Sequence, residues 1–393
     1  MLVGDRYIAL GVVRSLGRRS IPVFVLAPPH CPTSFSRYAA GCFPWPRDKD
    51  HQIQCLLDLS ARHELRDWPL FPTDDEGVGL IARHHTELAT HFVLVTPTWD
   101  RVQWAYDKRQ TYTMAARLKI DHPWTVYPDG AEDLIRLVDH FPVILKPAIK
   151  ESKNAFTSAR AWRVETQQEL RARYDQACCL IEPRHIMVQQ LLKGSCEARF
   201  SYAAVCIDGT AIASVVLQRV RQYPTEFAHY STYVETVHCP EVEQRGEHIV
   251  SAMKYSGVVE IEFQRDPVDT KLKILDANPR FWGSHTIGAA AGVDFPYLQW
   301  LLSDGNTLPR MKGRAGVRWV RMLGDVRAAL ALIKAGALSP WAYLRSLRFP
   351  LAHALFALDD PVPVLVECAM MVYRRRPNRS ARGVQASASR PPS

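Results

Sequence analysis

Acidic side chains that could bind a divalent cation are concentrated between residues 257 and 284. Residues 258–263 alternate apolar and acidic side chains, and a turn rich in aspartate and proline separates them from a second apolar run at 272–275. This pattern predicts a hairpin of two strands. Because side chains alternate between the two faces of a strand, Glu260 and Glu262 share one face of the first strand.

The end of the second strand adds further polar groups. Asp276 and Asn278 share a face there, and Arg280 follows two residues later. If the two faces coincide, the hairpin presents Glu262, Asp276 and Asn278 together. Such oxygen ligands suit Mg²⁺ that also binds nucleotide phosphates, and Arg280 could contact the same phosphates through two parallel hydrogen bonds. The alternative is a solvated hairpin with ordinary acidic residues on its outer face.

Composition indicates an ordinary globular protein. The chain has 393 residues, of which 47% are apolar and 23% charged, enough for two or three packed domains. No signal-peptide pattern and no apolar run long enough to span a membrane is found, so we expect a cytoplasmic location. The nine cysteines are scattered and never spaced as Cys-x2-Cys, which predicts reduced core thiols and no zinc site.

The net charge of +9 is concentrated at the end of the chain, where residues 374–393 hold six arginines and no acidic residue. The rest of the chain is therefore close to neutral, and specific nucleic-acid binding is not expected. The tail has the composition of a disordered, solvated segment. Attraction to anionic lipid or to another polyanion is the alternative. The basic and apolar helices expected beyond residue 316 could pack on the core or lie on a membrane or a partner.

The first hundred residues alternate predicted strands and helices, which indicates a parallel sheet. Its first strand is very short, since only Leu2 and Val3 precede Gly4, so either the start assigned to the chain is late or the sheet lacks an ordered edge. The run 73–76 has the pattern of a capping box, and Asp74 and Asp75 could either cap a helix or contact a substrate. No Gly-x-Gly-x-x-Gly run is present, so no dinucleotide site is predicted.

The middle of the chain supplies basic residues. Lys108 follows the start of a predicted helix, and Lys146 ends an apolar strand. A lysine at a strand end usually extends into solvent, but together with Lys108 and the acidic hairpin it favours triphosphate binding. Arg219 and Arg221 are two residues apart in an extended segment. We therefore expect them on one face, where they could bind a phosphate or a carboxylate.

Taken together and in this order, these landmarks resemble the ATP-grasp superfamily of carboxylate-amine and carboxylate-thiol ligases over roughly residues 1–310. More narrowly, they resemble its bacterial predicted carboxylate-amine ligase branch, which is similar to D-aspartate ligase and to the large subunit of carbamoyl-phosphate synthase. The motifs that carry this narrower likeness are Ser36-Arg37-Tyr38, residues 71–76, the arginines near 219, residues 278–284 and residues 359–363.

The resemblance implies a combined α/β and α+β fold. A Rossmann-like preATP-grasp domain would cover residues 1–105 and precede the two lobes of the ATP-grasp fold. The N-lobe would cover 106–185, and the C-lobe with the Mg-ATP site would cover 186–312. A helical region at 313–373 and the basic tail at 374–393 would follow.

The resemblance also implies roles for individual residues. Its phosphate loop, at 148–158, has no glycine, so side chains there could replace backbone contacts. Asp276 stands where glutamate is more usual and is one methylene shorter. For the nucleotide, the resemblance implies phosphate contacts from Lys108 and Lys146, adenine contacts from the backbone of Gln190, Leu191 and Leu192, and a ribose contact from Glu197. For the metal it implies the ligands Glu262, Asp276 and Asn278, and for catalysis it implies Lys146, Arg219, Arg221 and Arg280. In the loop, Lys150, Ser152 and Lys153 would supply the substitute contacts.

The activity implied is ATP-dependent ligation, in which a carboxylate is activated as an acyl phosphate and an amine or similar nucleophile then forms an amide-type bond. The cofactors would be ATP and Mg²⁺, with Mn²⁺ as a substitute, and the partners a small-molecule carboxylate and an amine. A homodimer is compatible with this interpretation, as is contact with a membrane or a protein through the C-terminal helices and arginine tail. The alternative function is a non-catalytic ATP-binding scaffold that docks through its basic C-terminus.

Overall fold

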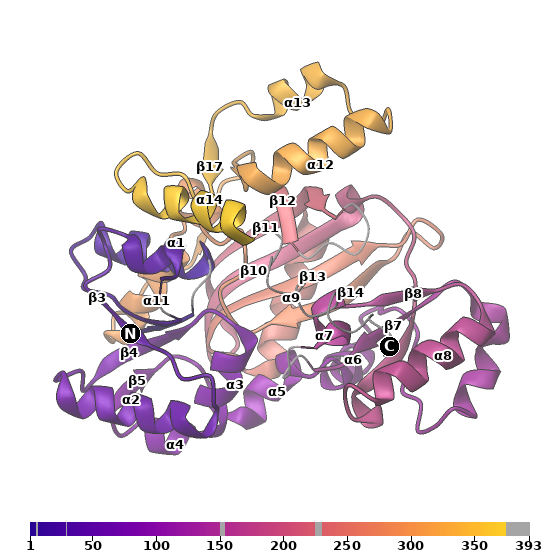
Figure 1. Cartoon of the computed structure of the whole chain (residues 1–393), viewed down its shortest axis with the longest axis horizontal. Coiled ribbons are helices and arrows are strands. Elements are labelled where there is room, and N and C mark those ends of the chain that lie inside the picture. Colours follow the sequence, from indigo (N-terminus) through magenta and orange to yellow (C-terminus); the bar gives the residue numbers. More distant parts are fainter. Residues whose placement is uncertain (5–6, 29, 150–153, 225–229, 375–393) are drawn as a thin grey trace, which may run out of the picture.

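The computed structural model describes residues 1–4, 7–28, 30–149, 154–224 and 230–374. These residues form the predicted mixed α/β fold, and their strands lie in three sheets. Figure 1 shows the five-stranded sheet at the left, the four-stranded sheet at the right and the eight-stranded sheet between them.

The five-stranded sheet is parallel and has the strand order β3-β2-β1-β4-β5. Although β1 is only two residues long, it lies at the centre of the sheet, and both its side chains are buried. The short first strand is therefore not an edge. The elements of this part are β1 (Leu2–Val3), α1 (Tyr7–Gly17), β2 (Phe24–Ala27), η1 (Pro32–Phe35), β3 (Gly41–Pro44), α2 (Asp50–Arg62), β4 (Trp68–Pro72), α3 (Asp75–Arg83), α4 (His85–Leu88) and β5 (Phe92–Leu94).

Gly4 explains how the chain leaves β1 beside β4. Its φ is +142°, and a Cβ atom at this position would lie 1.8 Å from Oγ1 of Thr73. Only glycine combines that backbone conformation with so close an approach. Thr73 uses the same hydroxyl to donate to the carbonyl of Val3 at 3.0 Å, which ties β1 to the end of β4.

Two helices connect the first sheet to the second, and the second sheet is antiparallel with the order β6-β9-β7-β8. A compact apolar core that includes Leu145, Phe156 and Val188 holds it together. The elements are α5 (Trp99–Tyr106), α6 (Lys108–Arg117), β6 (Thr125–Val126), η2 (Asp133–His140), β7 (Val143–Pro147), α7 (Ala155–Ala159), β8 (Trp162–Val164), α8 (Gln167–Cys178), η3 (Pro183–His185) and β9 (Ile186–Gln190).

The eight-stranded sheet has the order β14-β13-β10-β11-β12-β16-β17, with β15 paired to β11. Asp208 and Gly209 connect β10 to β11, and both have the positive φ that a two-residue hairpin turn requires. The elements are η4 (Cys196–Ala198), β10 (Arg199–Ile207), β11 (Thr210–Tyr223), β12 (Tyr230–Thr236), α9 (Pro240–Met253), β13 (Gly257–Arg265), β14 (Leu272–Asn278), α10 (Ile287–Ala291), α11 (Phe295–Ser303), β15 (Met311–Lys312), β16 (Arg318–Val320) and β17 (Leu351–His353).

The region expected to be helical beyond residue 312 thus contributes strands as well, because β16 and β17 extend the large sheet. Its helices are α12 (Met322–Lys334), α13 (Pro340–Ser346) and α14 (Val362–Arg374). None of the helices within the described residues is both long and apolar enough to cross a membrane. Of the arginine tail, the structure describes only Arg374, and residues 375–393 lie outside the described residues.

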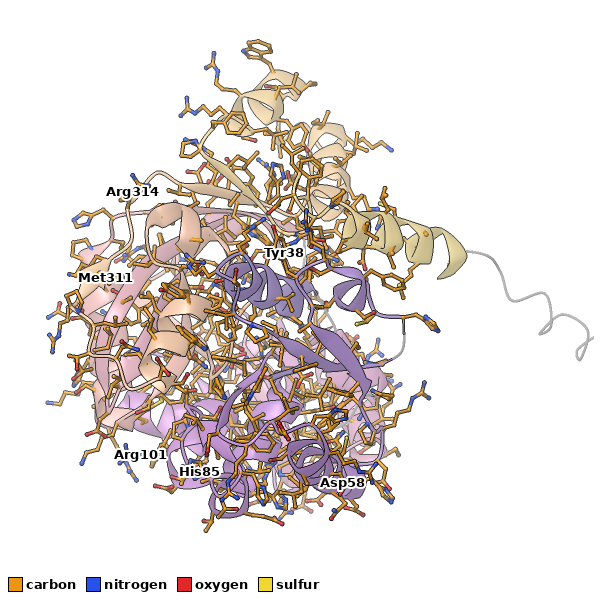
Figure 2. The ribbon with its side chains drawn as sticks, turned by 90° about the vertical axis from the view of Figure 1, so that its left-hand side faces the viewer. Tyr38, Asp58, His85, Arg101, Met311 and Arg314 are labelled. Atoms are coloured by element: carbon orange, nitrogen blue, oxygen red, sulfur yellow. The ribbon has the colours of Figure 1, made fainter. Side chains whose placement is uncertain are left out.

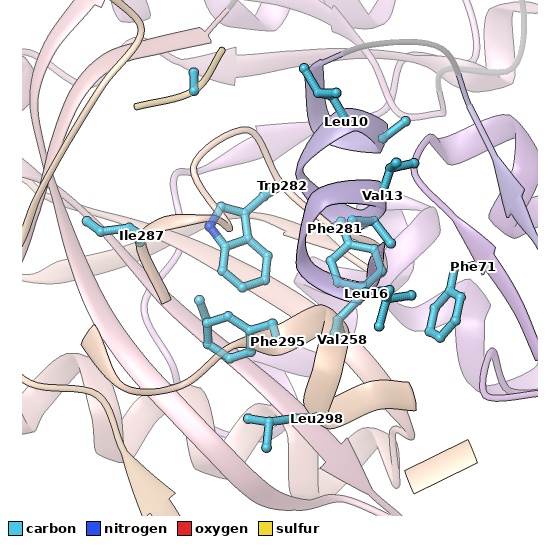
Figure 3. Packing of buried hydrophobic residues seen from close by; sticks show 14 of the residues in the cluster. Leu10, Val13, Leu16, Phe71, Val258, Phe281, Trp282, Ile287, Phe295 and Leu298 are labelled. Atoms are coloured by element: carbon cyan, nitrogen blue, oxygen red, sulfur yellow. The ribbon is translucent and has the colours of Figure 1, made fainter. Parts of the chain in front are cut away.

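One apolar core joins the first sheet to the large sheet. Figure 3 shows Phe281 and Trp282, which directly follow the Asn-Pro-Arg run, packed beside Leu10, Val13 and Leu16 of α1. Phe281 and Trp282 are almost fully buried. The backbone after Arg280 is therefore held by close packing against α1.

The C-terminal segment is tied to the first domain by the two sequence motifs at 36–38 and 359–363. Asp360 accepts hydrogen bonds from Arg14 and Ser36, and the Tyr38 hydroxyl donates to Asp359 at 2.8 Å. Figure 2 shows Tyr38 below α12 and α13 and at about the height of α14. These motifs, which supported the resemblance to one branch of ligases, therefore dock the end of the chain.

The cysteines form no disulfide among the described residues, and only Cys31 and Cys206 are buried. The expectation that all nine are core thiols is wrong, because the scattered positions fall mostly on partly exposed elements and Cys42 and Cys179 are exposed.

Candidate active site

The hairpin β13–β14 brings the predicted acidic residues together. In its antiparallel register Glu262 lies opposite Asp276, and Glu260 lies opposite Asn278. Residues directly opposite each other project from the same face of a sheet. The predicted juxtaposition of Glu262, Asp276 and Asn278 is thus confirmed. A bulge beyond Glu262 leaves Leu275 without a direct partner and so changes the register next to the cluster.

Basic and amide groups surround these carboxylates. The Lys108 ammonium lies 2.7 Å from Asp276, and the Arg219 guanidinium lies 3.0 Å from Glu262. The Asn278 amide nitrogen donates to Glu260 at 3.2 Å and to Glu262 at 3.1 Å. Two carboxylates and an amide oxygen are therefore held in a fixed arrangement by cations from α6 and β11.

Arg280 extends the cluster toward the first domain. Its guanidinium donates twice to Asp75, at 2.7 and 3.2 Å, and once to the Asn278 side-chain oxygen at 3.3 Å. Asp74 accepts from the Gly77 backbone at 2.7 Å and caps α3. Asp74 therefore takes the capping role, whereas Asp75 pairs with Arg280 beside the cluster.

Burial and neighbouring charges set the ionisation of the cluster. Burial, reinforced by Glu262, raises the pKa of Glu260 to about 8. Burial also opposes ionisation of Glu262, but the arginines Arg219, Arg160 and Arg199 together outweigh it, so the pKa of Glu262 is lowered. Burial likewise opposes the charge of Arg280, yet Asp75 raises its pKa. At neutral pH β13 therefore carries a protonated Glu260 and, two residues later, an ionised Glu262.

Lys108 and Lys146 reach the same part of β14. Asp107 caps α6 by accepting from the Arg109 backbone at 2.9 Å, so Lys108 is the first helical residue. The Lys146 ammonium lies 3.5 Å from the Tyr112 hydroxyl, which donates to the Leu275 carbonyl at 2.8 Å. Lys108 contacts the neighbouring Asp276. Lys108 therefore contacts β14 directly, whereas Lys146 is linked to it through the Tyr112 hydroxyl.

The segment expected to bind adenine leaves the small sheet at the end of β9. The Gln190 backbone donates to the Trp124 carbonyl at 3.0 Å, and half-buried Leu191 and Leu192 follow outside the strand. Gln264 of β13 donates to the Lys193 carbonyl at 3.1 Å. This segment therefore crosses directly from the small sheet to the strand that carries Glu262.

Glu197, the predicted ribose contact, lies in η4, and its side chain is exposed. Its backbone carbonyl accepts from the Gln218 side chain at 2.8 Å, which holds η4 against β11. The side chain itself is therefore available to solvent.

The expectation that Arg219 and Arg221 share a face is wrong. A bulge shifts the β11–β12 register, so Arg219 lies opposite Val234 and Arg221 lies opposite the adjacent Tyr233. The extra residue turns Arg221 to the other side of the sheet. There it is buried and donates twice to Asp325 of α12, at 2.9 and 2.8 Å. Only Arg219 lies in the acidic cluster.

Arg160 is a basic residue near the cluster that the sequence did not indicate. It follows α7 with a φ of +67°, and its charge interacts with Glu262, Asp75, Arg219 and Arg280. No residue-type pattern near 160 distinguishes it. The loop residues Lys150, Ser152 and Lys153, which were expected to contact phosphate, lie outside the described residues.

Arg199 is a second basic residue near the cluster that the sequence did not indicate. Burial and the nearby charge of Arg219 lower its pKa to about 10. Its guanidinium donates to the Gln264 side chain at 3.1 Å. Arg199 therefore adds positive charge beside the strand that carries Glu262.

The donor set fits one hard cation that completes its coordination with other ligands. Two facing carboxylates and an amide oxygen are available, and Mg²⁺ commonly takes one or two carboxylates and fills its shell with phosphates and water. Within the described ranges no group of three or more His, Cys, Asp or Glu side chains could hold a metal alone. A small cavity beside these groups is lined by Asp75, Ala105, Tyr106, Lys108, Asp276, Ala277 and Asn278.

No protein-family model matches the sequence, and no curated protein sequence matches it. Solved structures do match. Biotin carboxylase of Campylobacter jejuni is 16% identical with a TM-score of 0.61 over 78% of this chain and 71% of that one. An L-amino acid ligase of Bacillus licheniformis is 14% identical with a TM-score of 0.60 over 77% and 72%. The N5-carboxyaminoimidazole synthetase of Staphylococcus aureus is 12% identical with a TM-score of 0.60 over 81% and 79%. The chain therefore has the ATP-grasp fold.

Proposed function

We propose that this protein is an ATP-dependent ligase that activates a carboxylate as an acyl phosphate and joins it to an amine or a similar nucleophile. The observation that carries the proposal is the facing of Glu262 and Asp276 across β13 and β14, with Lys108, Arg219 and Arg280 around them. An oxygen-ligand cluster ringed by cations is suited to a metal-bound polyphosphate. The fold supports the same conclusion, since its solved examples include an amino acid ligase.

In this proposal Glu262, Asp276 and Asn278 hold Mg²⁺, while Lys108 and Lys146 bind the phosphates. The metal, when bound, supplies charge neutralisation for the polyphosphate. Lys108 contacts Asp276, and the same ammonium would also bind a phosphate oxygen beside that carboxylate. The contact of Lys108 with Asp276, and the link of Lys146 to the neighbouring Leu275 through Tyr112, support these roles.

The nucleoside would lie against the backbone of Gln190, Leu191 and Leu192, with Glu197 at the ribose. The segment leaves β9 immediately before these leucines, and non-strand backbone has N–H and C=O groups available for a base edge. The exposed side chain of Glu197 supports the ribose contact.

The chemistry requires alignment and charge neutralisation more than a covalent side chain. A carboxylate oxygen forms a bond to the γ-phosphorus of ATP as the bond from that phosphorus to ADP breaks. The nucleophile's nitrogen then bonds to the acyl carbon, the bond from that carbon to the phosphate oxygen breaks, and the nitrogen loses a proton to solvent. Arg280 and Arg219 balance the charge of the transferred group. Arg160 is placed to add a further positive charge.

The test is a double variant, Glu262→Gln with Asp276→Asn, which keeps side-chain shape but removes both negative charges. ADP release is measured with Mg²⁺ and a panel of carboxylates and amines. We expect substrate-stimulated ADP release by the parent and a loss of at least about a hundredfold in the variant. Equal release by the folded variant would contradict the proposed site.

The matched control removes two acidic charges from the ion-pair group around Arg245, at Asp121 and Glu241. We expect the variant Asp121→Asn with Glu241→Gln to retain the parent rate. Nucleotide binding is measured in parallel by the shift in unfolding temperature. A parent that binds ATP but releases no ADP with any substrate pair would identify the scaffold instead of the ligase.

A further inference from the structure

The C-terminal helices carry an unusual concentration of exposed apolar side chains. Of the fifteen large apolar residues exposed in the described part of the chain, ten lie between residues 322 and 365. We call these ten residues the C-terminal apolar surface. They are Met322, Val326, Leu330, Trp341, Leu344, Phe349, Phe356, Leu358, Val362 and Leu365.

The orientation of α12 shows that this exposure has a pattern. Its small residues Gly324, Ala328 and Ala329 face the protein, whereas Met322, Val326 and Leu330, spaced four apart, face outward. An amphipathic helix on a globular protein normally buries its larger apolar residues. Here the larger residues form the outer stripe. Figures 1 and 2 show α12, α13 and α14 on one side of the molecule, with α13 protruding.

Within the described part of the chain, the acidic residues between 322 and 374 face the rest of the protein, whereas most of the basic residues there do not pair with it. The four acidic residues of this segment all pair with arginines of the protein: Asp325 with Arg221, Asp359 with Arg18, Asp360 with Arg14 and Glu367 with Arg321. The basic residues Arg327, Lys334, Arg345 and Arg348 have no acidic partner among the residues described. The sequence beyond Arg374 adds five arginines and no acid. Outward apolar groups are thus accompanied almost wholly by positive charge.

Two occupants of this surface are disfavoured by composition and charge. The remaining segment, 375–393, contains Val384 as its sole large apolar residue, so it cannot cover ten apolar side chains. A second copy of the chain would bring the same unpaired basic residues face to face, and like charges at an interface oppose association. An occupant with an apolar interior and a negatively charged surface would match both the exposed apolar side chains and the unpaired basic residues.

We propose that the C-terminal apolar surface binds an anionic lipid bilayer. Trp341 is 67% exposed, Phe349 85% and Leu358 87%, and aromatic and aliphatic side chains of this kind partition into the interfacial region. Lysines and arginines beside them are attracted to anionic headgroups. The protein lies on the bilayer without crossing it. Figure 1 shows α12, α13 and α14 away from α6 and β7, the elements that carry Lys108 and Lys146.

The test is sedimentation of the full chain with vesicles of phosphatidylcholine alone and with vesicles that also contain phosphatidylglycerol. We expect binding to the second kind only, weakened by added salt. The variant Trp341→Ser, Leu344→Ser, Phe349→Ser should bind at least about tenfold more weakly. Replacing Arg345 and Arg348 with alanine should weaken binding about fivefold for each charge removed.

The matched control replaces three exposed apolar residues elsewhere, Ile135, Ile207 and Val268, with serine. All these side chains are exposed, and unfolding temperatures confirm that each variant is folded. The proposal is overturned if the parent binds neither vesicle, if the triple variant binds like the parent, or if the control loses binding equally. It is also overturned if light scattering shows a dimer that the triple variant converts to a monomer, which would assign the surface to a second copy.

Discussion

Asp360 should be the residue on which docking of the C-terminal segment depends most. Its buried carboxylate accepts from Arg14 at 2.9 Å, from Ser36 at 2.6 Å and from the Arg37 backbone at 3.0 Å. The side chains of Arg14 and Asp360 are only 6% and 1% exposed. In the variant Asp360→Ala, Arg14 would keep hydrogen bonds to the carbonyls of Leu355 and residue 360 but lose its counter-charge.

Removing one partner of a buried ion pair costs about 3–5 kcal/mol, because the other charge stays buried and uncompensated. The neighbouring Asp359 provides a matched comparison. Its pair with Arg18 is exposed, with side chains 44% and 41% accessible, so Asp359→Ala should cost about 0.2–1 kcal/mol. Two adjacent aspartates in one loop should therefore differ severalfold in their effect.

Native-state hydrogen exchange, measured by mass spectrometry, compares how strongly the two substitutions destabilise the docked C-terminal segment. We expect amides of α14, which packs on η1, to exchange about a hundredfold faster or more in Asp360→Ala, with much smaller changes in α8 of the distant lobe. Asp359→Ala should change these rates by less than about tenfold. The reasoning is refuted if the two variants accelerate exchange equally, or if Asp360→Ala leaves α14 protected.

Two further predictions concern buried charges. In the folded protein the pKa of Glu260 is about 8, against an ordinary value of 4.5, so the native state binds this proton more tightly than the unfolded chain does. The stability that this proton contributes is fully present below pH 4.5 and is lost as the pH rises through 8. The free energy of unfolding, measured with urea, should therefore fall between pH 4.5 and 8. In Glu260→Gln the contribution of residue 260 to this fall should be absent, and a variant with the same pH profile as the parent would contradict the prediction. Asp325→Ala should cost about 3–5 kcal/mol by leaving Arg221 unpaired, whereas Arg221→Met with Asp325→Leu should recover most of it in thermal unfolding. A double variant no more stable than the single one would contradict this.

The sequence by itself determined the local features of the site. The alternation of apolar and acidic residues at 258–263 requires a strand whose acids share a face, and the turn before 272 requires an antiparallel return. The position of Lys108 at the start of α6 follows from the cap at Asp107. These features could be predicted because each depends on residues a few positions apart, through strand alternation and helix capping.

Tertiary structure decided which distant groups meet. Asp75 and Arg280 are 205 residues apart and pair because Phe281 and Trp282 pack on the first domain, which no local pattern specifies. Arg160 enters the site through a backbone turn with positive φ.

The bulge in β11 shows the limit of local prediction most directly. One extra residue sends Arg219 to the acidic cluster and Arg221 to Asp325. A bulge arises where the neighbouring strand and the packing on both faces favour it over regular pairing, and those partners lie far away in the chain. The face of a regular strand follows from the sequence, whereas only the assembled sheet decided which of Arg219 and Arg221 lies in the acidic cluster.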